Sequence, residues 1–328
     1  MTDAFFAENG LAQQIGRRVP GAAVEIFSGV KPDPTLELVA QGLKQLQQCQ
    51  PEVVIALGGG SAIDCAKAMV YFYEPAVVFV AVPTTSGTGS EVTSFSILTH
   101  DGVKHPLIDQ KLLPQIAILD PALLEKLPKS LIADAGMDVL SHCLEAVCAK
   151  GCTPFATALA TEAFARVFDQ LAVSYRGDTT VRGDIHIAAT MAGLAFDHAG
   201  LGLCHALSHA LGGAFHTPHG RLNGILLPAV IEFNAETCVA PYRQLAARCG
   251  LLGATDTLTT KALVRALIQL RRQLQMPRTL KEAGISPEAL KPRLHQIAQS
   301  ASQDPCCAAN PRPATVQQLE QLLWTVAT

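Results

Sequence analysis

The repeating pattern of the sequence changes near residue 120, and this change constrains the fold more than any other feature. Up to that point, short runs of β-branched and aliphatic residues alternate with stretches of helical apolar spacing. Alternating strands and helices predict a parallel sheet with crossover helices. The predicted strands are 23–27, 52–57, 76–82 and 115–119, the predicted helices are 35–48 and 61–71, and a hairpin is predicted at 94–98 and 104–108 with its turn at 100–102.

Beyond residue 121 the sequence predicts helices alone, because segments with helical apolar spacing follow one another without a strand pattern between them. We find no internal repeat or long linker, so we expect two domains: an α/β domain over residues 1–120 and an all-helical domain over residues 121–328. The predicted helices are 129–149, 154–172, 180–198, 202–214, 223–233, 240–249, 256–273, 287–300 and 314–326.

Composition excludes several classes of protein. With 49% hydrophobic and 16% charged residues, the chain can bury a large core and is unlike a disordered protein. A net charge of -3 provides no broad attraction for nucleic acid or an anionic membrane, so we expect neither as a partner. The N-terminus lacks a signal-peptide pattern, and no apolar run reaches the roughly 20 residues of a membrane span. The ten cysteines include no CxxC pair, and we expect buried free thiols in a cytoplasmic protein.

Two polar, glycine-rich loops follow predicted strands of the first domain. Gly58-Gly59-Gly60-Ser61 opens a predicted helix, where unpaired backbone N–H groups and the positive helix end favour a phosphate. That pattern alone is also compatible with a tight turn in which Ser61 caps the helix. The second loop, residues 83–91, offers five hydroxyls and two glycines beside the core. Two adjacent loops of this kind predict a dinucleotide ligand.

Histidines concentrate in one segment of the second domain. His205 and His209 are four residues apart on one predicted helix face, and a turn can return His219 to the same face. Asp138 and His142 repeat the four-residue spacing on an upstream helix. One aspartate and three histidines would hold a divalent metal, with Fe²⁺ or Zn²⁺ favoured and Mn²⁺ also suited. Each pair taken alone is weak evidence, because a histidine pair with this spacing on a semi-apolar helix is more often part of the core. Asp138 could also serve only to complement the helix dipole.

These segments together resemble the iron-containing (group III) alcohol dehydrogenase family, in the same order and context. The likeness is greatest with the propanol and ethanol dehydrogenases of propanediol and ethanolamine utilisation, and it covers nearly the whole chain. The segments that define it are 58–61, 83–91, 136–142 and 200–220 for the family as a whole, with 32–35, 117–121, 199–203 and 310–312 in addition.

The resemblance implies a fold, a set of metal ligands and a set of cofactor contacts. The fold would be a Rossmann-like parallel-sheet domain followed by a helical metal-binding domain of the dehydroquinate synthase type. Asp138, His142, His205 and His219 would hold Fe²⁺, with Zn²⁺ as the alternative. His209 would remain uncoordinated and pass a proton outward. The NAD contacts implied by the resemblance are Asp3, Gly59, Gly60, Ser61, Thr84, Thr85, Thr88 and Lys104.

The N-terminus departs from the family pattern. Family members begin with a β-hairpin and a first sheet strand that ends in Thr-Asp, whereas this chain begins Met1-Thr2-Asp3. We therefore expect the first strand to be missing and Asp3 to lie on a mobile terminus. By resemblance, Asp3 would hydrogen-bond the adenosine ribose and select NAD over NADP, so NAD binding is expected to be weakened.

The resemblance implies an NAD-dependent alcohol dehydrogenase that, in cells, mainly reduces short aldehydes such as propanal and acetaldehyde and so regenerates NAD⁺. Phe196 and Leu201 favour a small substrate over a bulky or phosphorylated one. We expect a homodimer or larger homo-oligomer in the cytoplasm, with a bacterial microcompartment as the alternative location. A glycerol dehydrogenase or a cyclising sugar-phosphate lyase would share this layout. From a different class, a truncated metal-binding homologue could act as the assembly partner of a related enzyme.

Overall fold

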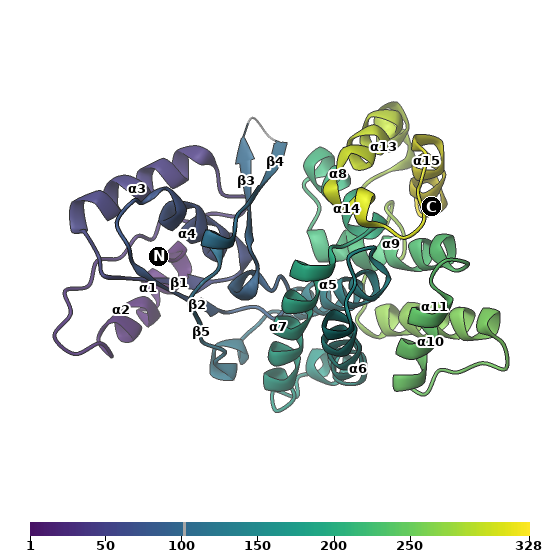
Figure 1. The fold of residues 1–328 in the computed structure, drawn as a ribbon, viewed down its shortest axis with the longest axis horizontal. Coiled ribbons are helices and arrows are strands. Elements are labelled where there is room, and N and C mark those ends of the chain that lie inside the picture. Colours follow the sequence, from purple (N-terminus) through teal and green to yellow (C-terminus); the bar gives the residue numbers. More distant parts are fainter. Residues whose placement is uncertain (101–102) are drawn as a thin grey trace. The chain divides into compact units, whose positions relative to one another are not determined.

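The computed structural model describes residues 1–100 and 103–328, with the backbone alone at 103 and 104. The chain divides into two units, residues 1–124 and residues 125–328. The first unit contains parallel strands and helices, and every regular element of the second is a helix, which confirms the predicted fold class (Figure 1). The turn predicted at 100–102 includes residues 101 and 102, which lie outside the described residues.

A parallel sheet and two helices form the core of the first unit. The strands, in sheet order, are β1 (Val53–Gly58), β2 (Val78–Pro83) and β5 (Ile116–Ala117), and the helices are α3 (Leu36–Cys49) and α4 (Gly60–Phe72). Ile63 and Met69 of α4 are fully buried in the hydrophobic cluster that joins the helices to the sheet. Gly58 at the end of β1 pairs with Pro83 at the end of β2. The loops that follow these strands therefore begin side by side.

Residues 1–3 lie beside β1, where the first strand was expected to be missing. The Thr2 N–H donates to the Phe27 carbonyl at 2.9 Å, and the Thr2 carbonyl accepts from the Val30 N–H at 3.4 Å. On the other side, β1 donates an N–H to the carbonyl of the first residue at 2.9 Å. Asp3 and Val30 form a parallel bridge. As expected, residues 1–3 form no regular strand, but Asp3 is not left without pairing, because these residues hydrogen-bond to neighbours on both sides.

The strand predicted at 23–27 does not form a regular ladder within the described residues. Residues 23–25 are exposed, whereas Phe27 packs against the hydrophobic cluster of this unit. Only its end takes part in the sheet, through the pairing of Phe27 and Val30 with the N-terminal residues. Residues 4–16, for which no element was predicted, form the short helices α1 (Ala4–Glu8) and α2 (Leu11–Gly16).

A buried lysine ties the predicted hairpin to α4. The hairpin strands are β3 (Phe95–His100) and β4 (Val103–Ile108). Lys67 is fully buried, and its Nζ donates to the Thr93 carbonyl at 2.7 Å and to the Phe95 carbonyl at 2.8 Å. One turn earlier, the Asp64 carboxylate accepts a β3 N–H at 3.0 Å. Helix α4 thus holds the far end of the polar loop that begins after β2.

Helix α5 is the most deeply buried element of the second unit and packs against α6, α7 and α9 (Figure 1). The long helices are α5 (Lys129–Cys148), α6 (Pro154–Arg176), α7 (Arg182–Ala199), α8 (Leu203–Phe215), α9 (His219–Asn234), α10 (Val239–Arg248), α11 (Asp256–Gln273), α13 (Leu294–Gln303) and α15 (Val316–Thr325). The helix predicted at 287–300 is divided at a 3₁₀ turn containing Pro292, which has no N–H to donate. The short α14 (Pro305–Ala309) was not predicted.

The structure bears on two features expected from the sequence, the absence of membrane spans and the burial of the cysteines. Among the described residues, no single helix is both long and apolar enough to span a membrane, although α7 and α8, bent by 101° at their junction, meet those criteria as a pair. All ten cysteines are free. Their predicted burial holds for five of them, four are half-buried, and Cys49 is exposed.

Candidate metal centre and nucleotide-binding loops

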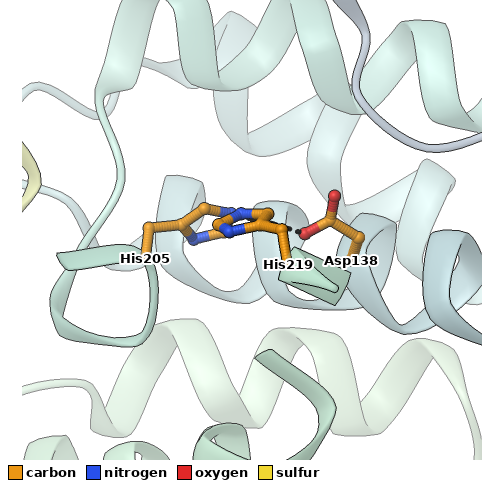
Figure 2. Close-up of side chains that lie close together, drawn as sticks. All are labelled: Asp138, His205 and His219. Carbon is orange, nitrogen blue, oxygen red and sulfur yellow. Dashed lines mark ion pairs between the residues drawn. The ribbon is translucent and has the colours of Figure 1, made fainter. Parts of the chain in front are cut away.

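Three helices of the second unit bring predicted metal ligands together. Asp138 lies on α5, His205 in the first turn of α8, and His219 is the first residue of α9. The Asp138 Oδ1 lies 3.7 Å from the Nε2 of His205 and 3.5 Å from the Nε2 of His219. Figure 2 shows both imidazole rings beside the Asp138 carboxylate. One ligand atom from each residue lies within 4.8 Å of the others, a spacing that a bound divalent ion could bridge.

His142, the fourth predicted ligand, lies one turn after Asp138 on α5. Its Nε2 is 3.9 Å from the Asp138 Oδ1, and its ring stacks on that of His205 with centroids 4.7 Å apart. The Phe196 ring packs against it at a centroid distance of 4.4 Å. The Nδ1 of His142 is buried and has no hydrogen-bond partner among the described residues. His142 is thus close to Asp138 but lies outside the group of Asp138, His205 and His219, whose ligand atoms are all within 4.8 Å of one another. With His142 included, the side chains offer three imidazole nitrogens and one carboxylate, a donor set that Fe²⁺ and Zn²⁺ accept.

The protonation of these groups follows from burial and from their mutual attraction. Burial lowers the pKa of His142 to about 3 and the pKa of His219 well below its ordinary value, so both rings are neutral and offer a lone pair. Burial opposes ionisation of Asp138, but attraction to the surrounding histidines holds its pKa well below the usual range. For His205, burial is outweighed by hydrogen bonds to Asp138 and Glu145, which raise its pKa to about 9.

Asn223 lies at the point where the ligand atoms converge and was not predicted. Its Nδ2 donates to the Asp138 Oδ1 at 2.6 Å and lies 3.1 Å from the Nε2 of both His205 and His219. The amide N–H₂ is the electropositive end of this side chain, so the cluster already attracts positive partial charge at that point. The four-residue spacing from His219 on α9 is the sequence signal that could have identified Asn223.

His209 lies one turn after His205 on α8 and is not one of the three clustered ligands. Its Nδ1 lies 2.8 Å from the Asp304 Oδ2, and its ring stacks on that of His219 with centroids 5.1 Å apart. The side chain is 30% exposed, against 1% for His205. Burial raises the pKa of Asp304, but the bond to His209 outweighs it and lowers the pKa to about 2. An ionised carboxylate on Nδ1 leaves the Nε2 of His209 to exchange protons.

The two polar loops of the first unit contact each other at the carboxyl edge of the sheet. A Cβ added to Gly60 would lie 2.7 Å from the Thr88 methyl group, and one added to Gly59 would lie 3.3 Å from that of Thr85. Gly59 is the N-cap of α4, so Ser61 lies inside the first turn and does not cap the helix. A phosphate at this edge would meet the N-terminus of α4 and the hydroxyls of the second loop.

The other predicted cofactor residues belong to the same unit. The Thr84 N–H donates to the Gly58 carbonyl at 3.0 Å, and the Thr84 side chain is buried. Asp3 follows the paired N-terminal residues, and its carboxylate accepts an N–H of α1 at 3.1 Å as the N-cap. Lys104 pairs with Thr99 in the hairpin, and its side chain lies outside the described residues.

The protein thus combines an α/β unit that carries two polar loops at the carboxyl edge of its parallel sheet with a helical unit that brings Asp138, His205 and His219 together. Residues 1–121 match the family described as iron-containing alcohol dehydrogenase, and residues 132–327 match the C-terminal part of the same family. The chain belongs to the iron-containing alcohol dehydrogenase family and is an oxidoreductase of that kind. The resemblance inferred from the sequence motifs is confirmed.

Two curated relatives match almost the whole chain. The 1-propanol dehydrogenase PduQ of Citrobacter freundii is 41% identical over 334 residues, covering 98% of this chain and 90% of that protein. The NADPH-dependent butanol dehydrogenase of Clostridium saccharobutylicum is 38% identical over 327 residues, covering 93% and 84% respectively. Among solved structures, sulfoacetaldehyde reductase from Bifidobacterium kashiwanohense in complex with NAD⁺ has a TM-score of 0.90 at 27% identity, covering 100% of this chain and 90% of that one.

Proposed function

We propose that this protein is a metal-dependent, NAD-linked alcohol dehydrogenase that interconverts short primary alcohols and aldehydes. The observation that carries the proposal is the convergence of Asp138 with the Nε2 atoms of His142, His205 and His219. The reactions are the reduction of propanal to 1-propanol and of acetaldehyde to ethanol, each with oxidation of NADH to NAD⁺. The similarity to the 1-propanol dehydrogenase of Citrobacter freundii supports this substrate class.

In this proposal the four residues hold the metal. The metal is Fe²⁺, with Zn²⁺ as the alternative. When bound, a divalent ion supplies Lewis-acid polarisation of an alcohol or aldehyde oxygen. The Asp138 carboxylate offsets part of its charge, and the burial of Asp138, His142 and His205 limits the access of water to these ligands, whereas the His219 side chain is 31% exposed. Phe196, packed on the His142 ring, presents an apolar surface to this region, which suits a short alkyl chain better than a charged one.

His209 moves the proton of the reaction. Alcohol oxidation releases one proton and aldehyde reduction consumes one, so a group that can gain and lose a proton near the substrate is required. Asp304 occupies the Nδ1 of His209, which makes Nε2 the atom that accepts or donates. Because its side chain is partly exposed, His209 can pass the proton to solvent, whereas the buried His205 cannot.

The nucleotide is assigned to the first unit, where both loops lie at the edge at which ligands bind parallel sheets. Asp3, at the same edge, disfavours the 2′-phosphate of NADP by charge repulsion, which favours NAD. The relative solved with NAD⁺ agrees with this choice, whereas the butanol dehydrogenase relative uses NADPH. The assigned residues are Gly59, Gly60 and Ser61 for the pyrophosphate, Thr84, Thr85 and Thr88 along the cofactor, Asp3 at the ribose and Lys104 toward the nicotinamide.

Steady-state assays of the Fe²⁺-loaded and Zn²⁺-loaded protein test the proposal. We expect kcat/KM to be higher for 1-propanol and ethanol than for glycerol, and higher with NAD⁺ than with NADP⁺. Asp3→Gly should reduce the preference for NAD⁺, because the charge that repels the 2′-phosphate is removed. Absence of turnover of short primary alcohols with either coenzyme in both metal-loaded forms would refute the proposal.

The assembly and location of the enzyme form a separate part of the proposal. We infer a homodimer or larger homo-oligomer that works in the cytoplasm or within a bacterial microcompartment. The inference extends the resemblance of the sequence motifs to the propanol and ethanol dehydrogenases of propanediol and ethanolamine utilisation. Light scattering of the purified protein measures the oligomer, and co-purification with isolated microcompartments measures the association. A monomer in scattering would contradict the first inference.

A further inference from the structure

Glu145 is a buried acidic side chain that none of the roles above uses. It lies on α5, seven residues after Asp138 and three after His142, so the three share one helix face. Its side chain is only 4% exposed. A carboxylate buried this deeply costs free energy unless hydrogen bonds satisfy it. Its partners therefore show what the fold uses it for.

Glu145 binds the N-terminus of α8 and the His205 side chain at the same time. Its Oε1 accepts from the Cys204 N–H at 2.6 Å, and its Oε2 accepts from the Gly202 N–H at 2.9 Å. The same Oε2 lies 2.6 Å from the Nδ1 of His205. A Cβ at position 202 would lie 2.8 Å from Oε1, so glycine there allows the carboxylate to approach. One side chain thus fixes both the helix end and the imidazole.

The contact determines which nitrogen of His205 faces the ligand cluster. A carboxylate accepts hydrogen bonds and donates none, so the Nδ1 of His205 carries a hydrogen. Metal binding displaces any hydrogen on the other nitrogen, so the atom left to bind a cation is Nε2, which lies 3.7 Å from the Asp138 Oδ1. If the hydrogen sat on Nε2 instead, the ring could not bind a metal in this orientation.

We propose that Glu145 is the positioning residue that prepares His205 for metal binding, by holding its Nδ1–H and the start of α8 together. The inference rests on the proposed function, because it takes His205 as a ligand. Glu145 also adds a second carboxylate to that of Asp138, so the two together match the charge of a divalent ion in a buried site. A residue that only capped α8 would need its contacts with the Gly202 and Cys204 N–H groups, but not its contact with the His205 ring.

Glu145→Gln tests this role. Glutamine keeps the length and one acceptor oxygen for the helix end, but its N–H₂ group then faces the Nδ1 of His205 and favours the hydrogen on Nε2. We expect the affinity for Zn²⁺ and for Co²⁺, measured by competition with a chelator, to fall about 10- to 100-fold. Glu145→Asp keeps the carboxylate and is expected to retain more affinity than Glu145→Gln.

Asn310→Ala is the matched control for a purely structural role. The Asn310 Oδ1 accepts from the Leu203 N–H at 3.3 Å, at the same end of α8, and its hydrogen bonds in the described residues do not involve the His205 ring. We expect this variant to lower the resistance of the metal-free protein to denaturant while leaving metal affinity unchanged. Equal losses of metal affinity in Asn310→Ala and Glu145→Gln would overturn the inference, as would unchanged affinity in Glu145→Gln.

His219→Ala separates this inference from the proposed function. If His219→Ala loses the metal while Glu145→Gln binds as tightly as the wild type, only the role of Glu145 is refuted. If the wild type and His219→Ala bind metal equally, His219 is not a ligand, and the four-residue site on which the proposed function rests is refuted. The visible absorption of the Co²⁺ form is a second readout, because its intensity depends on the ligands of the ion rather than on the stability of α8. We expect Glu145→Gln to change that spectrum and Asn310→Ala to leave it unaltered.

Discussion

Gly220→Ala should separate two of the proposed metal ligands, Asp138 and His219, without removing either of them. Gly220 follows His219 at the start of α9, and a Cβ built there lies 2.1 Å from the Asp134 carbonyl oxygen and 3.2 Å from the Asp138 Cβ. Ordinary contact begins at 3.4 Å, so α9 and α5 must move apart by about 1.3 Å (3.4 − 2.1) against backbone atoms. Metal–ligand distances tolerate only about 0.2 Å. Overpacking of this kind costs about 1–3 kcal/mol, and a clash with backbone belongs at the upper end.

Denaturant unfolding of the metal-free protein and metal titration together check this prediction. We expect the variant to lose about 3 kcal/mol of stability and most of its metal affinity. Gly213→Ala is the control, because a Cβ on Gly213 of α8 meets no atom within 4 Å. That change should stabilise the helix by roughly 0.5–1 kcal/mol and leave metal binding intact. Wild-type stability and metal affinity in Gly220→Ala would show that the two helices separate freely, contrary to this reasoning.

Three further predictions concern individual side chains. His219→Ala should lower the metal content of anaerobically purified protein below one ion per chain, measured by elemental analysis, because a four-ligand site tolerates loss of a ligand poorly; unchanged content would exclude His219 as a ligand. His209→Ala should keep the metal and lower kcat by about 10²–10⁴-fold in steady-state assays, since a proton relay does not hold the ion; loss of metal would instead make His209 a ligand. Lys67→Met should lower the free energy of unfolding by at least about 2 kcal/mol, measured with denaturant, because the buried charged hydrogen bonds to Thr93 and Phe95 are lost. Unchanged stability would show that these hydrogen bonds do not stabilise the loop.

Local periodicity was sufficient to predict most of the helical unit. The segment 256–273 was predicted as a helix and forms α11 with those bounds, because its buried apolar residues keep a strict helical spacing. The same spacing placed Asp138 and His142 on one face of α5, and the structure brings His205 and His219 to that face. Spacing within a helix is thus enough to find side chains that share a face.

Contacts between distant segments were not predictable in this way. Asn223 hydrogen-bonds to Asp138, which is 85 residues away in the sequence, and Asp304 contacts His209, which is 95 residues away. No local pattern distinguishes these polar residues from solvated ones, since their partners are chosen by the packing of whole helices. The strand expected at 23–27 failed for a related reason, because alternation records side-chain polarity but not whether a neighbouring strand is present.

The 95-residue separation between His209 and Asp304 has a consequence for biosynthesis. Asp138, Glu145, His205, His219 and Asn223 have all been made once the ribosome passes residue 223. At a translation rate of about 5–20 residues per second, Asp304 follows His209 by roughly 5–20 seconds. The nascent chain therefore holds every proposed metal ligand well before the carboxylate that orients His209 exists. The order of synthesis thus places the residues of the proposed metal site before the partner on which the proposed proton relay depends.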